Sequence, residues 1–283
     1  MENNYTITKT LQLGRELLQP HHESAALEAE ILLCHCLNKS RAYLRTWPEK
    51  PLNKEVLAQY QQLLARRQQG EPIAYITGYK EFWDLRLHVT PEVLIPRPET
   101  EHLVELVLEK IPADAAWHIA DLGTGSGAIA LAVARERPRC RITATDQSSA
   151  SLAVAKDNAL HNNIHNVRFR ESYWFEALEN ECFQMVVSNP PYVAENDPHL
   201  KQGDLRFEPV SALSSGPQGL DDIEHIIRHA GAYLTAPGWL LLEHGYQQGD
   251  AVVQLLRNNG FQDVQCHSDY AQLERVSAGR LSI

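Results

Sequence analysis

Short apolar runs alternate with helical patterns from residue 117 to residue 280, and this alternation constrains the fold more than any other feature. Strands are predicted for Trp117–Leu122, Arg141–Thr145, Val167–Arg170, Phe183–Ser188, Trp239–Leu242, Gln265–Ser268 and Arg275–Arg280. Helices are predicted for Ala128–Arg137, Ser148–His161, Leu220–Leu234 and Gln247–Asn259. Strands and helices in this order form an α/β structure, a parallel sheet with helices on both faces. Ligands bind such sheets beyond the carboxyl ends of the strands, so the functional site is expected there.

The first 80 residues have a different character, because their apolar residues recur with helical spacing throughout. The predicted helices are Thr10–Leu18, Ser24–Leu37, Ser40–Thr46 and Asn53–Gln69. A period-two pattern follows at Leu85, Leu87 and Val89, which is typical of a strand and predicts half of a hairpin. We therefore expect a helical N-terminal domain over residues 1–80, and a hairpin linker with an α/β domain over residues 81–283.

Charge and composition exclude several classes of protein. The 283 residues carry a formal charge of −10, with +2 in residues 1–80 and −12 in residues 81–283. This acidic balance argues against coating nucleic acid by charge alone. No apolar run approaches the roughly 18 residues that span a bilayer, and Met1–Tyr5 has no basic or apolar signal region. Five cysteines without framework spacing indicate a reducing compartment. A cytoplasmic, monomeric enzyme without membrane or direct nucleic-acid contacts is expected.

A glycine-rich stretch, Asp121-Leu122-Gly123-Thr124-Gly125-Ser126-Gly127, joins the strand that ends at Leu122 to the helix that follows. Its glycines permit a tight turn and let a ligand touch the backbone. Asp146 ends the next strand, where a carboxylate can accept hydrogen bonds from two ribose hydroxyls. Packing alone would explain glycines in such a turn, but the strand, the helix and the acid together favour a nucleoside cofactor. The glycine spacing fits neither the dinucleotide fingerprint nor a P-loop.

A second motif, Asn189-Pro190-Pro191-Tyr192, directly follows the predicted strand Phe183–Ser188. Two prolines fix φ and remove two donors, so the nearby carbonyls stay rigid and free to accept. The Asn189 side chain adds another carbonyl, and Tyr192 offers a flat face for stacking. In isolation, a structural Pro-Pro turn would be the simpler explanation. Beside a cofactor loop, the motif instead predicts a site for a planar NH₂ group with two hydrogens to donate.

The glycine loop is similar to that of S-adenosylmethionine methyltransferases, which implies a sulfonium methyl as the transferred group. Such a methyl is already strongly electrophilic, so the protein mainly has to hold nitrogen, carbon and sulfur in line. Acceptors at Asn189 and at the Pro190 carbonyl would favour pyramidal nitrogen and stabilise the positive charge that develops on it. The nitrogen becomes acidic once alkylated, so no general base is needed before transfer. We find no candidate base in the sequence.

The glycine loop resembles the first motif of class I S-adenosylmethionine methyltransferases, and Asn189–Tyr192 resembles the motif of those that methylate planar nitrogens. Two further stretches are Gly70-Glu71-Pro72-Ile73-Ala74-Tyr75-Ile76-Thr77-Gly78 and Ile95-Pro96-Arg97-Pro98-Glu99-Thr100-Glu101. With these, the chain resembles the release factor glutamine methyltransferases over nearly its whole length. The resemblance implies a Rossmann-like class I methyltransferase sheet, a small helical domain that docks the protein substrate, and S-adenosyl-L-methionine as methyl donor.

It further implies methylation of N5 of the glutamine in the Gly-Gly-Gln motif of release factors 1 and 2. The cofactor residues implied are Gly123, Thr124, Gly125, Ser126, Gly127, Asp146, Trp174 and Asn189. The implied substrate residues are Asn189, Pro190, Pro191 and Tyr192, of which Asn189, Pro190 and Tyr192 would be catalytic, with Arg97 and Glu99 at the entry. No metal site is expected, because Cys34 and Cys36 lie two positions apart on a predicted helix and point away from each other.

Three alternatives stay open. A DNA or RNA adenine-N6 methyltransferase uses a similar tetrapeptide, but it needs a basic groove for a flipped base. A glutamine methyltransferase of a ribosomal protein would share the fold and the tetrapeptide, but its entry motif differs after Ile-Pro-Arg. A non-enzymatic helical adaptor would leave both motifs without use.

Overall fold

The computed structural model describes residues 5–20 and 22–282. The chain divides into two compact units, Met1–Gly78 and Tyr79–Ile283. The expected division after residue 80 would have assigned Tyr79 and Lys80, the start of the first hairpin strand, to the helical part. Met1–Asn4, where no signal region was expected, lie outside the described residues. No helix in the described ranges combines the length and the apolar character needed to cross a membrane.

The N-terminal unit consists of helices around one apolar core. They are α1 (Ile7–Leu18), α2 (Ala25–Leu37), α3 (Arg41–Thr46), α4 (Lys54–Gln68) and the short α5 (Ile73–Thr77). Asn53, the first residue of the predicted helix Asn53–Gln69, caps α4, because its side chain accepts a hydrogen bond from the Val56 amide at 2.9 Å. Tyr60 of α4 lies over Gly14 of α1, where a Cβ would meet the tyrosine oxygen at 2.0 Å. Close packing of these two helices therefore depends on the glycine.

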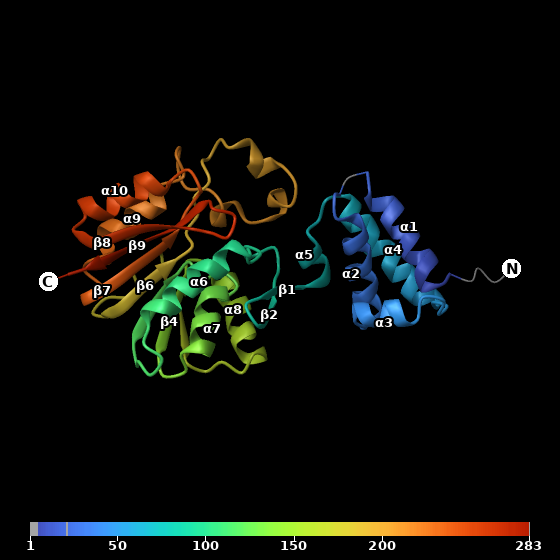
Figure 1. The fold of residues 1–283 in the computed structure, drawn as a ribbon, viewed down its shortest axis with the longest axis horizontal. Coiled ribbons are helices and arrows are strands. Elements are labelled where there is room, and N and C mark those ends of the chain that lie inside the picture. Colours follow the sequence, from blue (N-terminus) through green and yellow to red (C-terminus); the bar gives the residue numbers. More distant parts are fainter. Residues whose placement is uncertain (1–4, 21, 283) are drawn as a thin grey trace. The chain divides into compact units, whose positions relative to one another are not determined.

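The larger unit begins with an antiparallel hairpin, β1 (Tyr79–Phe82) and β2 (Leu85–His88), followed by α6 (Glu99–Lys110). Strands and helices then alternate as β3 (His118–Leu122), α7 (Ala128–Glu136), β4 (Arg141–Asp146), α8 (Ser149–His161), β5 (Val167–Glu171) and β6 (Phe183–Ser188). The chain ends with α9 (Asp221–Ala230), β7 (Leu234–Glu243), α10 (Gly249–Asn258), β8 (Phe261–Ser268) and β9 (Glu274–Leu281). Figure 1 shows these elements in place.

The seven-stranded sheet has the order β5-β4-β3-β6-β7-β9-β8. Its strands are parallel except for β9, which pairs antiparallel with both β7 and β8. After β3, the strands β4 and β5 are added on one side of it, whereas β6 and β7 are added on its other side. The strand order therefore reverses between β3 and β6. The carboxyl ends of these two strands, Leu122 and Ser188, lie in register beside each other. The predicted parallel sheet is confirmed, and its switch point lies where both sequence motifs begin.

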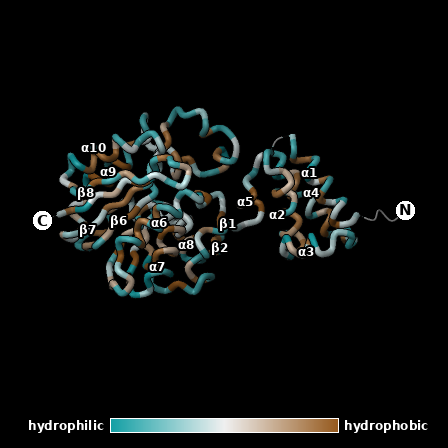
Figure 2. Tube along the Cα trace, in the orientation of Figure 1, coloured by the Kyte–Doolittle hydropathy of each residue, from teal (hydrophilic) through white to brown (hydrophobic). Residues whose placement is uncertain are grey.

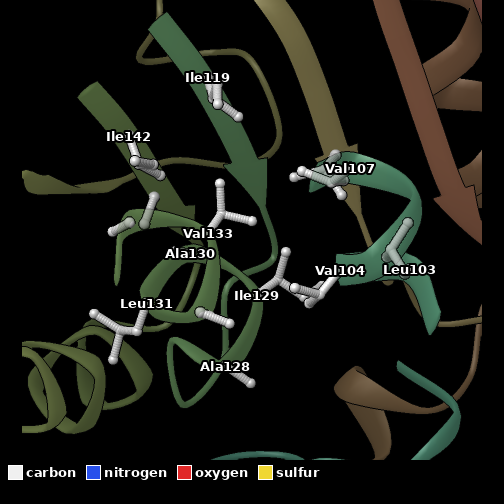
Figure 3. Close-up of a cluster of buried hydrophobic side chains, with 14 of the residues drawn as sticks. Leu103, Val104, Val107, Ile119, Ala128, Ile129, Ala130, Leu131, Val133 and Ile142 are labelled. Carbon is white, nitrogen blue, oxygen red and sulfur yellow. The ribbon is translucent and has the colours of Figure 1, made fainter. Parts of the chain in front are cut away.

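Helices cover both faces of the sheet. Alternate residues of β3 face opposite sides, so Ile119 packs with α6 and α7 while Ala120 packs with α9 and α10. Figure 3 shows Ile119 and Ile142 of the sheet facing Val133 of α7 and Val107 of α6. In Figure 2 hydrophobic residues gather along β6 and on α10, which pack together on the face of the sheet that α9 and α10 cover. Because both faces are covered, the two central strands are nearly continuous apolar runs.

The predicted helix over Leu220–Leu234 is wrong at its carboxyl end. The helix ends at Ala230, and Leu234 starts strand β7 instead of continuing the apolar face of α9. The Phe183 amide donates to the Tyr233 carbonyl at 2.8 Å, so pairing with β6 takes over where helical spacing still continues. Strands β7 and β8 are correspondingly longer than the predicted Trp239–Leu242 and Gln265–Ser268. The helix α5 has no predicted counterpart.

Candidate active site

The glycine-rich loop turns between β3 and α7 with positive φ at Gly123, Gly125 and Gly127. A Cβ at Gly123 would lie 3.3 Å from the Trp174 ring, and one at Gly127 would lie 3.1 Å from Leu131. A Cβ at Gly125 would meet nothing within 4 Å, and this residue lines a hollow beside the loop. Two of the glycines therefore allow close packing, and Gly125 exposes its backbone to a ligand.

Asp121 holds the glycine loop from beneath. Its fully buried carboxylate accepts the Thr124 hydroxyl at 2.6 Å and the Ala130 amide at 3.2 Å. Burial raises the pKa of Asp121 to about 7, although both hydrogen bonds lower it. Its other oxygen, Oδ1, has no hydrogen-bond partner among the described residues. Between about pH 4 and pH 7 the folded carboxyl is therefore largely protonated while the unfolded one is ionised, so folding takes up a proton in this window.

Replacing Asp121 by Asn should flatten the pH dependence of stability between about pH 4 and pH 7. The folded pKa of about 7 exceeds the ordinary value of 3.8, so the folded state binds more protons in this window. The free energy of unfolding of the wild type therefore falls as the pH rises, by up to about 1.4 kcal/mol per pH unit from this group. Asn has no proton to lose. Urea denaturation of both proteins at several pH values measures the slopes, and equal slopes would contradict the assignment.

Asp146 links the loop to the next strand. One carboxylate oxygen accepts the Gly125 amide at 2.9 Å, and the other accepts the Ser148 amide at 2.9 Å. Burial raises the pKa of Asp146, while both backbone hydrogen bonds lower it. Each carboxylate oxygen keeps a further lone pair. The side chain also lines the hollow, so it can still accept hydrogen bonds from a ligand there.

The hollow has a volume of about 870 Å³, with open solvent at its mouth included. The predicted site residues that line it are Gly123, Gly125, Asp146, Trp174, Asn189 and Pro191. The glycine loop, Asp146 and the tetrapeptide therefore meet at one cavity, although they come from three separate strand ends.

Trp174 is buried beside the hollow in a backbone conformation with φ of 45°. Its indole Nε1–H donates to Asp222 at the start of α9, at 3.1 Å. The Ser172 hydroxyl donates to the Trp174 carbonyl at 3.0 Å and accepts the Ala177 amide at 2.9 Å. These bonds fix the aromatic ring as one wall of the cavity, and Asp222 lines it as well.

The tetrapeptide leaves β6 with its polar groups in defined positions. The Asn189 Nδ2–H donates to the Thr100 hydroxyl at 3.1 Å, and the Tyr192 hydroxyl donates to Glu243 at 3.2 Å. Within the described ranges, neither the Asn189 side-chain oxygen nor the Pro190 carbonyl has a hydrogen-bond donor. The segment thus presents two free acceptors, as the motif predicts for a site that binds an NH₂ group.

A loop returns to the tetrapeptide and packs against it. The Val193 amide donates to the Leu213 carbonyl at 2.8 Å, and the Ser215 amide donates to the Val193 carbonyl at 3.0 Å. A Cβ at Gly219 would overlap the Tyr192 carbonyl oxygen at 2.2 Å. Residues Pro209, Ser211 and Ala212 of this loop line the hollow. The loop is therefore part of the cavity wall.

Arg97 and Glu99, expected at the entry, do not line the hollow. Arg97 forms an ion pair with the buried Glu208, which also accepts the Ile95 amide at 3.0 Å. Burial raises the pKa of Glu208, and Arg97 lowers it. Arg97 therefore ties the entry segment to the loop. Glu99 is exposed in the first turn of α6, where the helix dipole favours an acid.

Four further predicted residues support the site without lining the hollow. Thr124 and Ser126 are buried beneath the loop, Gly127 packs against α7, and Tyr192 reaches Glu243. Pro190 does not line the cavity either.

Sequence analysis missed the supporting roles of Thr100, Asp121, Asp222 and Glu243. A threonine or an acid at a helix start or a strand end has many ordinary explanations, so no local signal marks these four residues. In the described ranges, no group of three or more His, Cys, Asp or Glu side chains is arranged to hold a metal ion.

Comparison with known proteins places the chain in a family. A family model described as the PrmC N-terminal domain matches residues 9–78, and one described as the methyltransferase small domain matches residues 100–204. The release factor glutamine methyltransferase of Vibrio cholerae is 50% identical over 277 residues, which cover 97% of this chain and 96% of that protein. The protein of that name from Pseudomonas aeruginosa is 48% identical over 274 residues, or 97% and 99% of the two chains.

A solved structure shares the fold. The 16S rRNA N2 G1207 methyltransferase of T. thermophilus, in complex with AdoMet and guanosine, aligns with a TM-score of 0.54. The alignment covers 72% of this chain and 49% of that one at 19% identity, which shows a likeness of fold alone. The predicted class I methyltransferase fold is thus confirmed. The two relatives are about half identical to this chain over nearly its whole length, which also determines its family. This chain belongs to the family of release factor glutamine methyltransferases.

Proposed function

We propose that this protein transfers a methyl group from S-adenosyl-L-methionine to the side-chain amide nitrogen of the glutamine in the Gly-Gly-Gln motif of release factors 1 and 2. The observation that carries the proposal is the side-chain oxygen of Asn189, a free acceptor on a residue that lines the cavity with the glycine loop. The Pro190 carbonyl, which follows it in the chain, likewise has no donor among the described residues. The names of the relatives supply the release factor and the glutamine.

The cavity residues fit a nucleoside cofactor with an amino-acid part. Gly125 leaves room for a ligand against its backbone, Asp146 has free lone pairs for ribose hydroxyls, and the Trp174 ring would flank a planar base. When bound, S-adenosyl-L-methionine supplies the methyl group as an electrophile and leaves as S-adenosyl-L-homocysteine. The related fold of the T. thermophilus enzyme carries AdoMet, which supports the same cofactor here.

The protein's own residues have two tasks in the transfer. Asn189 and Pro190 would accept both hydrogens of the substrate amide, which turns the nitrogen lone pair out of conjugation and stabilises the charge that develops. The rigid Pro190-Pro191 segment would hold this nitrogen in line with the methyl group. Tyr192 is held by Glu243 and would pack against the planar amide. Arg97 and Glu99 would flank the entry for the substrate loop.

We also propose that the helical unit docks the release factor. Residues 1–80, which contain this unit, carry a net charge of +2, against −12 for residues 81–283. The unit has its own apolar core, so it can present a stable surface. A docking role predicts that an intact release factor is a much better substrate than a short peptide with the same Gly-Gly-Gln motif.

Transfer of a labelled methyl group tests the proposal. The acceptors are purified release factor 1 or 2, the same factor with its motif glutamine changed to alanine, the short peptide, ribosomal proteins, and duplex DNA. We expect label on the intact factor, weak label on the peptide, and none on the alanine variant. Label on ribosomal protein or on DNA in place of the factor would overturn the substrate assignment in favour of one of the alternatives.

A further inference from the structure

A chain of buried polar groups runs beneath the tetrapeptide. Asn189 bonds to Thr100 in the first turn of α6, and Glu243, the last residue of β7, is close enough for the Thr100 hydroxyl to lower its pKa. Oε2 of Glu243 has no hydrogen-bond partner among the described residues. Thr100 and Glu243 are 3% and 1% exposed. Strand pairing sets Leu242 beside Ser188, so Glu243 lies next to the end of the strand that carries Asn189. Three elements distant in sequence thus meet under the proposed substrate amide site.

The Asn189 amide has two chemically opposite ends. Its Nδ2–H donates to the Thr100 hydroxyl at 3.1 Å, which leaves Oδ1 free at the cavity. If the amide were turned over, the Thr100 hydroxyl could donate to Oδ1 instead, and the cavity would face an NH₂ group. An NH₂ group cannot accept hydrogens from a substrate amide. The proposed chemistry therefore depends on which way the Thr100 hydrogen points.

Glu243 can set that direction when it is ionised, because a carboxylate only accepts hydrogen bonds. Burial raises the pKa of Glu243 to about 7, and the hydroxyls of Thr100 and Tyr192 lower it, which favours the ionised form. Arg275 also lowers this pKa, and Glu99 raises it. A Thr100 hydroxyl whose hydrogen is directed at Glu243 offers only lone pairs to Asn189. The Tyr192 hydroxyl donates to the same carboxylate at 3.2 Å.

We propose that Thr100 and Glu243 are positioning residues that fix the Asn189 amide with its oxygen toward the substrate. The proposal rests on the proposed function and names the residues that orient its central acceptor. Glu243 takes the Thr100 hydrogen, Thr100 takes the Asn189 hydrogen, and Asn189 is left with its acceptor in the cavity. The same carboxylate holds Tyr192, so one buried group orients two residues of the tetrapeptide.

Substitutions at Thr100 test this arrangement. Val has the shape of Thr without the hydroxyl, so Thr100→Val should lower kcat for release factor methylation at least tenfold, with an unchanged Kd for S-adenosyl-L-methionine. Thr100→Ser keeps the hydroxyl and should restore kcat to within about threefold of the wild type. Thr143→Val is the matched control, because Thr143 is 1% exposed and its hydroxyl bonds to His118 away from the cavity. An unchanged kcat in Thr100→Val would overturn the proposal.

Glu243→Gln tests the second half. The Gln side chain can donate to Thr100 and release the Asn189 amide, so kcat should fall about as far as in Thr100→Val. The double variant should be no slower than either single variant, because both act through the same amide. Additive losses would show that the two residues act separately and would overturn the proposed relay.

A measurement without methyl transfer keeps the inference separate from the proposed function. In protein labelled with ¹⁵N-asparagine, the Asn189 NH₂ signal, assigned by its loss in Asn189→Ala, should exchange slowly with solvent. This protection should disappear in Thr100→Val and persist in Thr100→Ser. Equal exchange in wild type and Thr100→Val would overturn the inference even if release factors are methylated. Absence of methylation by the wild type, with protection as expected, would instead count against the proposed function alone.

Discussion

The Asn189→Ala variant should lose methyl transfer to the release factor by roughly 10²–10³-fold, with an almost unchanged affinity for S-adenosyl-L-methionine. The substitution removes the free side-chain acceptor beside the cavity, so one hydrogen of the substrate amide is left without a partner. The cofactor loop is held by Asp121 and Asp146 instead, and neither of these contacts involves Asn189. Single-turnover transfer and calorimetric titration of the cofactor measure the two effects.

Asn259→Ala provides the control, because Asn259 is exposed at the end of α10 and bonds only locally to the Leu255 carbonyl. Its transfer rate should match that of the wild type. If Asn189→Ala lost cofactor binding together with transfer, Asn189 would belong to the cofactor site, and its proposed role toward the substrate amide would be wrong.

Gly125→Val should weaken cofactor binding by two orders of magnitude or more. Gly125 has φ of +54° and lines the cavity, so a branched side chain would fill the space against the backbone and also strain the turn. Equilibrium binding of S-adenosyl-L-methionine measures the loss, and thermal unfolding measures the strain separately.

Gly203 offers a matched control for this substitution. It has the same φ of +54°, it also has nothing within 4 Å of a built Cβ, and it does not line the cavity. Gly203→Val should therefore carry the backbone strain without the loss of binding. If both variants bound the cofactor equally well, Gly125 would not lie at the cofactor site.

Features that depend on neighbours in sequence were predicted well. The helix predicted from Asn53 needs only the nearby Val56 amide at its start, and the tight turn predicted at Gly123, Gly125 and Gly127 lies where a strand turns at once into a helix. The parallel sheet and the junctions of its two central strands with the motifs were likewise predictable. Each follows from a local pattern repeated along the chain.

Features that depend on distant residues were not predictable. Thr100 lies 89 residues from Asn189, Tyr192 lies 51 from Glu243, and Ile95 lies 113 from Glu208. No periodicity connects such pairs. The prediction for the end of α9 was wrong for the same reason. Leu234 fits the apolar face of the helix but instead pairs with Phe183 of β6. Tertiary pairing overrides local propensity at these positions.

The hydrogen bonds of Val193 with Leu213 and Ser215 have a consequence for evolution and design. They bring both ends of the intervening segment together beside Tyr192, so residues 194–207 can change while Glu208 and the cavity wall after it stay in place. Loop-closure entropy grows slowly, and doubling the length of such a segment costs only about 0.6 kcal/mol. Insertions there would therefore alter the surface beside the site at small entropic cost, without moving the tetrapeptide.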